Sequence, residues 1–240
     1  MEQKIGMVHY NTPELTVACI LSLRKTGCDW PIVMLDNSDA RPFKKRMKGV
    51  KRIDNTKGNV INFDAELEKY PDKCWDLAWR SNYGSFKHML SVQYLWGVMP
   101  DGFILVESDM IIKKDIRWMW QPQFAAVGKV QRYQPGNKMQ VHRLLPFLLY
   151  MNVPLLVKYG AKFFDPDRCW GLQFGGKKQR KNWYDTGAAL LEDIRRTKPS
   201  LVARNYSNLV DFYDHYKGGS WKHNDLESQL KWLADRQQYW

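Results

Sequence analysis

The sequence predicts an α/β fold in which one mostly parallel β-sheet is flanked by helices. Over about the first 115 residues, short apolar segments alternate with helical stretches. Two of these segments, 31–36 and 103–107, are almost continuously apolar, which is typical of strands covered by helices on both faces. The rest of the chain is punctuated by Trp, Pro and Gly and is less regular. No repeat or Gly/Ser-rich linker divides the chain, so we expect a single domain over 1–240.

The first 36 residues have the pattern of a β-α-β unit. A strand over 4–10 is followed by Asn11 or Thr12, either of which can cap a helix that begins with Pro13 and ends before Gly27. The apolar run 31–36 is the next strand. Two strands joined by a helix of this length pair in parallel, and we therefore expect the sheet to begin with such a pair.

The later elements follow from the same patterns. We expect a basic loop and a short strand within 44–53, a long helix over about 76–99, a strand over 103–107, and helices near 152–159, 187–197 and 225–238. The apolar run 144–157 is interrupted by Pro146, Asn152 and Pro154. We interpret this run as a buried wall or a loop; it could line a pocket, contact a membrane or belong to the core.

Composition excludes several classes of protein. The chain has 240 residues, of which 44% are hydrophobic, so it can form a core and is unlike disordered chains. No run of about 18 apolar residues occurs, which excludes a membrane-spanning helix.

Because a strand already begins near Lys4, we expect a cytoplasmic protein, with peripheral contact to the inner face of a membrane as a further option. The four Cys residues lack metal-type spacing, and we expect buried free thiols.

The net charge of +12 indicates an anionic partner. Nucleic acid, a phosphate-bearing ligand and an acidic membrane surface all fit this charge. The densest basic runs, 44–52 and 177–181, are expected to be loops that either bind phosphate or lie in solvent.

Polar residues follow three predicted strands, at the edge where α/β sheets bind their ligands. They are the segments His9–Pro13, Asp36–Ser38 and Glu107–Asp109. Neither GxGxxG nor GxxxxGK[ST] occurs, so the chain lacks the dinucleotide-binding and phosphate-loop signatures. Two carboxylates separated by Ser108 can bind Mg²⁺ or Mn²⁺ together with substrate phosphate oxygens, although such acids also cap turns.

Taken together, these motifs resemble family-2-type inverting glycosyltransferases of the GT-A fold, which have a single Rossmann-like sheet. The matching segments are Val8–Glu14, Ser22–Leu23, Leu35–Ser38, Asn82–Gly84 and Phe103–Asp109, the last being similar to the family's metal-binding DxD strand. Later in the chain, Tyr184–Gly187 is similar to the segment that carries the family's catalytic base, and His215–Trp221 to a C-terminal histidine loop. The resemblance implies a half that binds a nucleotide-sugar, about 1–115, and an irregular half that binds the acceptor, about 116–240.

The resemblance also implies roles for individual residues. Asp109 and His215 would bind Mn²⁺ or Mg²⁺, and Asp185 would be the general base. Asp36 would contact the nucleobase or ribose of the donor. The other implied donor contacts are His9, Asn11, Asn82, Glu107, Ser108 and Lys217. Glu107 departs from the Asp that usually begins the family's triplet.

Each of these residues also has a structural interpretation. His215 could be a hydrogen-bonded structural residue, Asn82 a helix start, and Asp185 the N-cap of the helix that follows it. Glu192 and Asp193 are expected on a solvated helix face. Three tryptophans beside the motifs could stack on a sugar acceptor or belong to the core; they are Trp170, Trp183 and Trp221.

The expected activity is metal-assisted transfer of a sugar from a nucleoside-diphosphate donor to a hydroxyl of a glycan, polysaccharide or lipid-linked acceptor. A nucleotidyltransferase of related fold is one alternative, but the segment His9–Pro13 lacks the Gly-rich basic loop such an enzyme needs. A non-enzymatic nucleic-acid-binding protein would explain the charge and the aromatic residues. It would not explain the carboxylates at the strand ends.

Overall fold

The structure is a computed structural model that describes residues 2–69, 80–132, 142–168, 185–197, 204–205, 207–216 and 224–240. Its strands are β1 (Ile5–His9), β2 (Ile32–Asp36), β3 (Val50–Asp54), β4 (Phe103–Val106), β5 (Met110–Ile112), β6 (Ala126–Gln131), β7 (Arg143–Met151), β8 (Arg204–Asn205) and β9 (Tyr213–His215). Its α-helices are α1 (Pro13–Lys25), α2 (Phe63–Glu68), α3 (Arg80–Val98), α4 (Val153–Lys158), α5 (Ala188–Thr197) and α6 (Leu226–Ala234).

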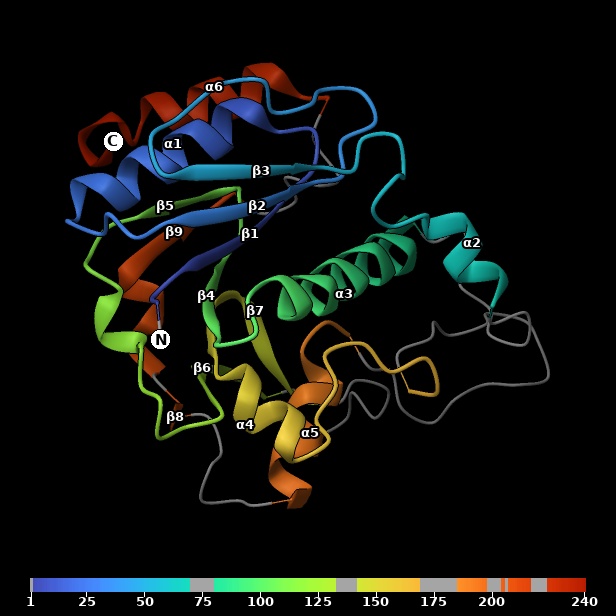
Figure 1. Cartoon of the computed structure of the whole chain (residues 1–240). Helices are drawn as coiled ribbons and strands as arrows, with labels where there is room; N and C mark the ends of the chain where they lie inside the picture. Colours follow the sequence, from blue (N-terminus) through green and yellow to red (C-terminus); the bar gives the residue numbers. More distant parts are fainter. Residues whose placement is uncertain are drawn as a thin grey trace.

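Seven of the described strands form one sheet in the order β3-β2-β1-β4-β7-β6-β8, and β5 pairs with β9 in a small second sheet. Strands β1 to β4 are mutually parallel, whereas β7 runs antiparallel to β4 and β6. Helices α1 and α6 lie on one side of the β1–β3 region and α3 on the other, as Figure 1 shows. The predicted α/β class, a mostly parallel sheet flanked by helices, is confirmed.

The sheet separates two hydrophobic clusters because side chains alternate between its faces. Ile5 and Met7 of β1 pack with α1, and Leu105 of β4 packs with α3 on the opposite face. Gly6 lies between the two β1 residues, and a Cβ atom there would be 2.5 Å from the Phe103 ring. The absence of a side chain at Gly6 therefore lets the Phe103 ring lie directly over β1.

The run 144–157 belongs to the core, one of the alternatives expected for it, and contains most of the central strand β7; only the loop alternative was wrong. Pro146 indicated a loop, because proline has no N–H group to donate to a strand ladder. In the structure Pro146 lies where the pairing of β7 with β6 shifts register, and beyond the last β4 partner, Leu148. The missing N–H of Pro146 thus falls at an irregularity of the sheet, where the regular ladder of hydrogen bonds is already interrupted.

A second correction concerns Asp193 of α5, which is buried and not on a solvated face. Its carboxylate accepts hydrogen bonds from the Arg168 and Arg196 guanidinium groups and from the backbone N–H of Lys162. Glu192 is half exposed, as expected. Cys19 and Cys28 are buried free thiols, as predicted. Among the described residues, no helix is long and apolar enough to cross a membrane.

Candidate active site

Two acidic side chains and one imidazole meet just beyond the end of β4. Glu107 and Asp109 follow β4, and His215 ends β9, which pairs with β5 so that Met110 lies opposite His215. The backbone N–H of Tyr216 also donates to the Asp109 carbonyl at 2.9 Å. These backbone pairings bring together residues that are more than a hundred positions apart in the sequence.

The side-chain distances in this cluster are short. The His215 Nε2 atom lies 3.3 Å from Glu107 Oε2 and 3.3 Å from Asp109 Oδ1. The Phe147 ring packs against the His215 ring with centroids 4.2 Å apart. Each of the three polar side chains keeps between 14% and 18% of its surface exposed, so the cluster is sheltered yet open to a ligand.

The three side chains of the cluster shift one another's pKa values. Burial lowers the pKa of His215, but its hydrogen bonds with Asp109 and Glu107 and their charges outweigh burial and raise the pKa to about 10. Burial raises the pKa of Asp109 above its usual value. Burial also opposes ionisation of Glu107, but hydrogen bonding to His215 and nearby positive charge bring its pKa below the usual value. A cation bound through His215 Nε2 would take the place of a proton on that nitrogen, so we expect metal binding to compete with protons.

These three residues could hold a metal ion. Their ligand atoms all lie within 4.8 Å of one another. Two ligand atoms bound at right angles, each about 2.1 Å from an ion, lie about 3.0 Å apart, close to the distances found here. Two carboxylates and one imidazole suit Mn²⁺ or Mg²⁺ when substrate oxygens supply the other positions. Glu107, predicted as a donor contact, thus lies beside the predicted metal ligands Asp109 and His215.

Asp185 lies between α3 and β7. Its carboxylate pairs with the Arg143 guanidinium and accepts a hydrogen bond from the Ser85 hydroxyl at 3.1 Å. Its side chain does not cap α5 as the structural alternative expected, because the Asp185 carbonyl and not the carboxylate accepts from the N–H of Ala188. Two residues on, Gly187 has φ +83°, and a Cβ there would be 2.1 Å from the Leu144 carbonyl oxygen. The turn that presents Asp185 therefore requires glycine.

His88 on α3 is a site residue that the sequence analysis missed. Its Nε2 atom lies 3.8 Å from Glu107 Oε1. Burial lowers the pKa of His88, and the charges of Glu107, Asp185 and Asp109 only partly oppose this. The sequence offered no signal for it, because Ser85, three positions earlier and on the same helix face, was not among the predicted site residues either.

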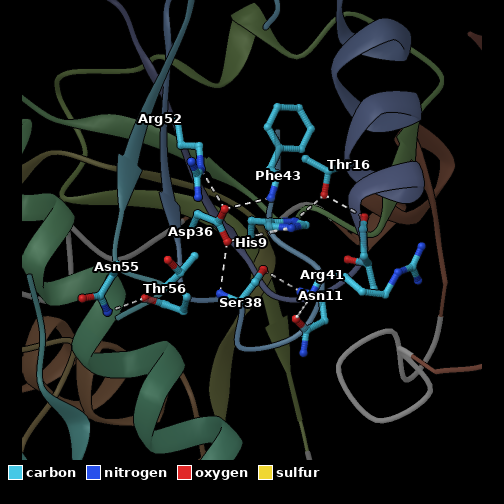
Figure 2. A network of polar contacts seen from close by, with 12 residues as sticks. His9, Asn11, Thr16, Asp36, Ser38, Arg41, Phe43, Arg52, Asn55 and Thr56 are labelled. Atoms are coloured by element: carbon cyan, nitrogen blue, oxygen red, sulfur yellow. Dashed lines mark hydrogen bonds and ion pairs between the residues drawn. The ribbon is translucent and has the colours of Figure 1, made fainter. Parts of the chain in front are cut away.

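The residues predicted to contact the donor at the ends of β1 and β2 form a buried network, drawn in Figure 2. The Asp36 carboxylate accepts from the backbone N–H groups of Ser38 and Phe43, at 3.1 and 2.9 Å, and from Arg52 Nε at 2.8 Å. His9 lies 3.9 Å from Asp36 and forms a 2.7 Å hydrogen bond with Thr16 through Nδ1.

Asn11 belongs to the same network and has a left-handed backbone with φ 55°. Its side-chain oxygen accepts from the backbone N–H groups of Ala40 and Arg41. The side chains of His9, Asn11 and Asp36 have 0% exposed surface. They hold the 38–43 loop in place, and a direct contact with a donor would require this loop to rearrange.

Replacing Asp36 with Asn is expected to lower the free energy of unfolding by about 1.5–3 kcal/mol, because the amide cannot accept all three charge-assisted hydrogen bonds. Asp54→Asn is the matched control. Asp54 also pairs with Arg52, at 3.2 Å, but its side chain is 56% exposed, so we expect a change of at most about 1 kcal/mol. Urea unfolding of both variants measures the difference; equal losses would contradict a structural role for Asp36.

The structure describes only some of the remaining predicted site residues. Ser108 is buried between Glu107 and Asp109. Asn82 lies in the first turn of α3, one turn before Ser85, and its side chain is not described. Lys217 and the three predicted acceptor-site tryptophans lie outside the described residues; they are Trp170, Trp183 and Trp221.

Neither protein-family models nor curated protein sequences match the chain. Solved structures similar to it include the PaToxG glycosyltransferase, with TM-score 0.41 and 15% identity over 99% of this chain and 78% of that one. The galactosyltransferase LgtC, solved with donor and acceptor sugar analogues, has TM-score 0.44 and 9% identity over 94% of both chains.

A third similar structure is the mannosyltransferase PcManGT from Pyrobaculum calidifontis in complex with GDP-Man and Mn²⁺. It has TM-score 0.35 and 12% identity over 70% of this chain and 48% of that one.

Proposed function

We propose that this protein is a glycosyltransferase that moves a sugar from a nucleoside-diphosphate donor to an acceptor hydroxyl with the help of a divalent cation. One observation carries the proposal: Glu107, Asp109 and His215 converge at the end of a central parallel strand, where ligands of α/β sheets bind. A carboxylate outside this cluster, Asp185, lies on the same side of α3 as His88. The proposed reaction needs both the cluster of Glu107, Asp109 and His215, which would hold the cation, and the separate carboxylate of Asp185.

The leaving diphosphate requires compensation of its developing negative charge. Glu107, Asp109 and His215 would hold Mn²⁺ or Mg²⁺, which when bound supplies Lewis-acid stabilisation of the phosphate oxygens. Arg143 adds a fixed positive charge near Glu107, and its influence on the pKa of Glu107 reflects that proximity. The net charge of +12 favours an anionic donor generally.

The acceptor hydroxyl must lose a proton, and we assign this to Asp185. Arg143 and Ser85 fix the orientation of its carboxylate, and 16% of its side chain is exposed and available to a substrate. Direct attack assisted by this base would invert the anomeric centre. Nuclear magnetic resonance of the first-formed product anomer tests inversion.

We further propose that residues 1–240 work as one domain, with the donor bound mainly by about 1–115 and the acceptor by about 116–240. The two parts share the metal site, because His215 joins Glu107 and Asp109. The acceptor would be a glycan, a polysaccharide or a lipid-linked sugar, the last reached by peripheral contact with an anionic membrane surface. A nucleic-acid-binding function is not favoured, because uncompensated carboxylates at this edge would repel phosphates.

A melting experiment tests the metal and donor site. We expect Mn²⁺ plus a matching nucleoside diphosphate to raise the melting temperature, because a ligand that binds only the folded state stabilises it. A panel of UDP, GDP, CDP, ADP and dTDP, with and without EDTA, identifies the base. Asp109→Ala should lose the metal-dependent shift, because it removes one of three protein ligands.

Asp115→Ala is the matched control for Asp109→Ala. Asp115 is 42% exposed and contacts Arg117, also on the surface, so its loss should leave the ligand shift unchanged. The same panel as nucleotide-sugars, assayed for released diphosphate, identifies the donor. Tight, salt-sensitive binding of oligonucleotides without metal, together with no response to any nucleotide, would refute the proposal.

A further inference from the structure

The His88 imidazole has a buried nitrogen without a hydrogen-bond partner. No described residue makes a hydrogen bond with His88 Nε2, although the atom is shielded from solvent. The carboxylate oxygen Glu107 Oε1 lies 3.8 Å from this nitrogen, beyond hydrogen-bonding distance. A buried unsatisfied nitrogen costs about 1–3 kcal/mol, so its presence beside a candidate active site requires an explanation.

Glu107 is placed between two imidazoles. Its Oε2 atom lies 3.3 Å from His215, while its Oε1 atom faces His88. His88 lies outside the group of three residues whose ligand atoms all lie within 4.8 Å of one another. A glutamate that binds a cation through Oε2 still has Oε1 free to accept a hydrogen bond.

We propose that His88 is a positioning residue that donates a hydrogen bond from Nε2 to Glu107 Oε1 when Glu107, Asp109 and His215 bind a divalent cation. This inference rests on the metal site of the proposed function. Hydrogen bonds to the second oxygen of a ligating carboxylate fix its orientation and strengthen metal binding. Glu107 needs such a partner more than an aspartate would, because its side chain has one more rotatable bond.

The chemistry of His88 suits this role. A neutral imidazole has one N–H donor, and unlike a lysine or arginine it orients a carboxylate without repelling the bound cation. The required closure is small, because the two atoms are already 3.8 Å apart and a charge-assisted hydrogen bond of this kind is about 2.7–2.9 Å long.

Helix α3 also contacts the proposed base. Ser85, three residues before His88, donates to Asp185 at 3.1 Å. The two side chains lie on one helix face, so α3 contacts the base through Ser85 and would contact the metal site through His88. The proposed hydrogen bond would thus fix the metal ligand Glu107 relative to Asp185.

Mn²⁺ affinity of the full chain, measured from the electron paramagnetic resonance signal of free Mn²⁺, tests the inference. The decisive pair is His88→Met and His88→Gln, which have similar shape and differ in the presence of an N–H donor. We expect His88→Met to weaken Mn²⁺ binding by about 10–100-fold, and His88→Gln to stay within about threefold of the wild type. The melting temperatures of the two variants without metal should agree with each other. This agreement separates a loss of Glu107 positioning from a loss of folding.

Equal Mn²⁺ affinities for His88→Met and the wild type would overturn the inference, as would equal weakening by Met and Gln. Wild-type protein and Asp109→Ala are measured alongside. If the wild type binds no Mn²⁺, or Asp109→Ala binds it normally, the metal site itself is refuted. Wild-type binding that depends on Asp109 but not on His88 leaves the proposed function intact and removes only the role of His88.

Discussion

Replacing Asp185 with asparagine is expected to slow sugar transfer by roughly 10²–10⁴-fold, the usual contribution of a general base. The amide retains the size of the carboxylate and can still accept from the Ser85 hydroxyl, which lies 3.1 Å from Asp185 Oδ1. It cannot take a proton from the acceptor hydroxyl. Because Asp185 does not belong to the metal cluster, the Mn²⁺-dependent melting shift with nucleoside diphosphate should remain.

The measurement is kcat with the donor and acceptor found by screening, together with the melting shift of the same preparation. Ser85→Ala is a useful comparison, because it removes one hydrogen bond to Asp185 but keeps the carboxylate. We expect Ser85→Ala to slow transfer far less than Asp185→Asn. A turnover of Asp185→Asn within about twofold of the wild type would remove Asp185 from the mechanism.

The sequence predicted the elements whose signals are local. The apolar runs that became β1, β2 and β4 and the helix that begins at Pro13 were found because strand and helix periodicities are visible within ten to twenty residues. The predicted cap of that helix was wrong, because Thr12 makes no side-chain capping hydrogen bond and the Asn11 side-chain oxygen accepts from Ala40 and Arg41 instead. The position of Asp109 was also predictable, because the carboxyl ends of parallel strands lie at one edge of the sheet. Asp109 and His215 were expected as metal ligands from the resemblance, and the β5–β9 pairing brings the two residues together.

Features that depend on distant contacts were not predictable in this way. Pro146 indicates a loop in any local pattern, and only the register shift beside it makes a central strand possible. Arg143 pairs with Asp185 from 42 positions away, and nothing in the sequence near either residue indicates the pair. Asp36 followed by Asn37 looks like a ligand-binding strand end, yet three donors of the folded chain surround the Asp36 carboxylate.

Asp193 shows most clearly how burial is decided by the tertiary structure. Beside Glu192 on a helix it looks like part of a solvated face, but only 1% of its side chain is exposed. Burial lowers the pKa of Arg168, but hydrogen bonds with Asp193 and Glu192 outweigh this and raise it, so the guanidinium stays charged. The Asp193 carboxylate therefore joins α5 to the 162–168 segment through charged hydrogen bonds.

Replacing Asp193 with alanine is expected to lower the free energy of unfolding by about 3 kcal/mol, because the largely buried Arg168 guanidinium loses two charged hydrogen bonds, although it keeps Asp165 and Glu192 as partners. Glu192→Ala is the matched control. Glu192 contacts the same Arg168 at 2.8 Å, but its side chain is 42% exposed, so we expect a loss of at most about 1 kcal/mol. Urea unfolding distinguishes the two variants. Similar losses would contradict the view that the buried Asp193 contributes more than the exposed Glu192 to holding α5, which follows the turn carrying Asp185, against the 162–168 segment.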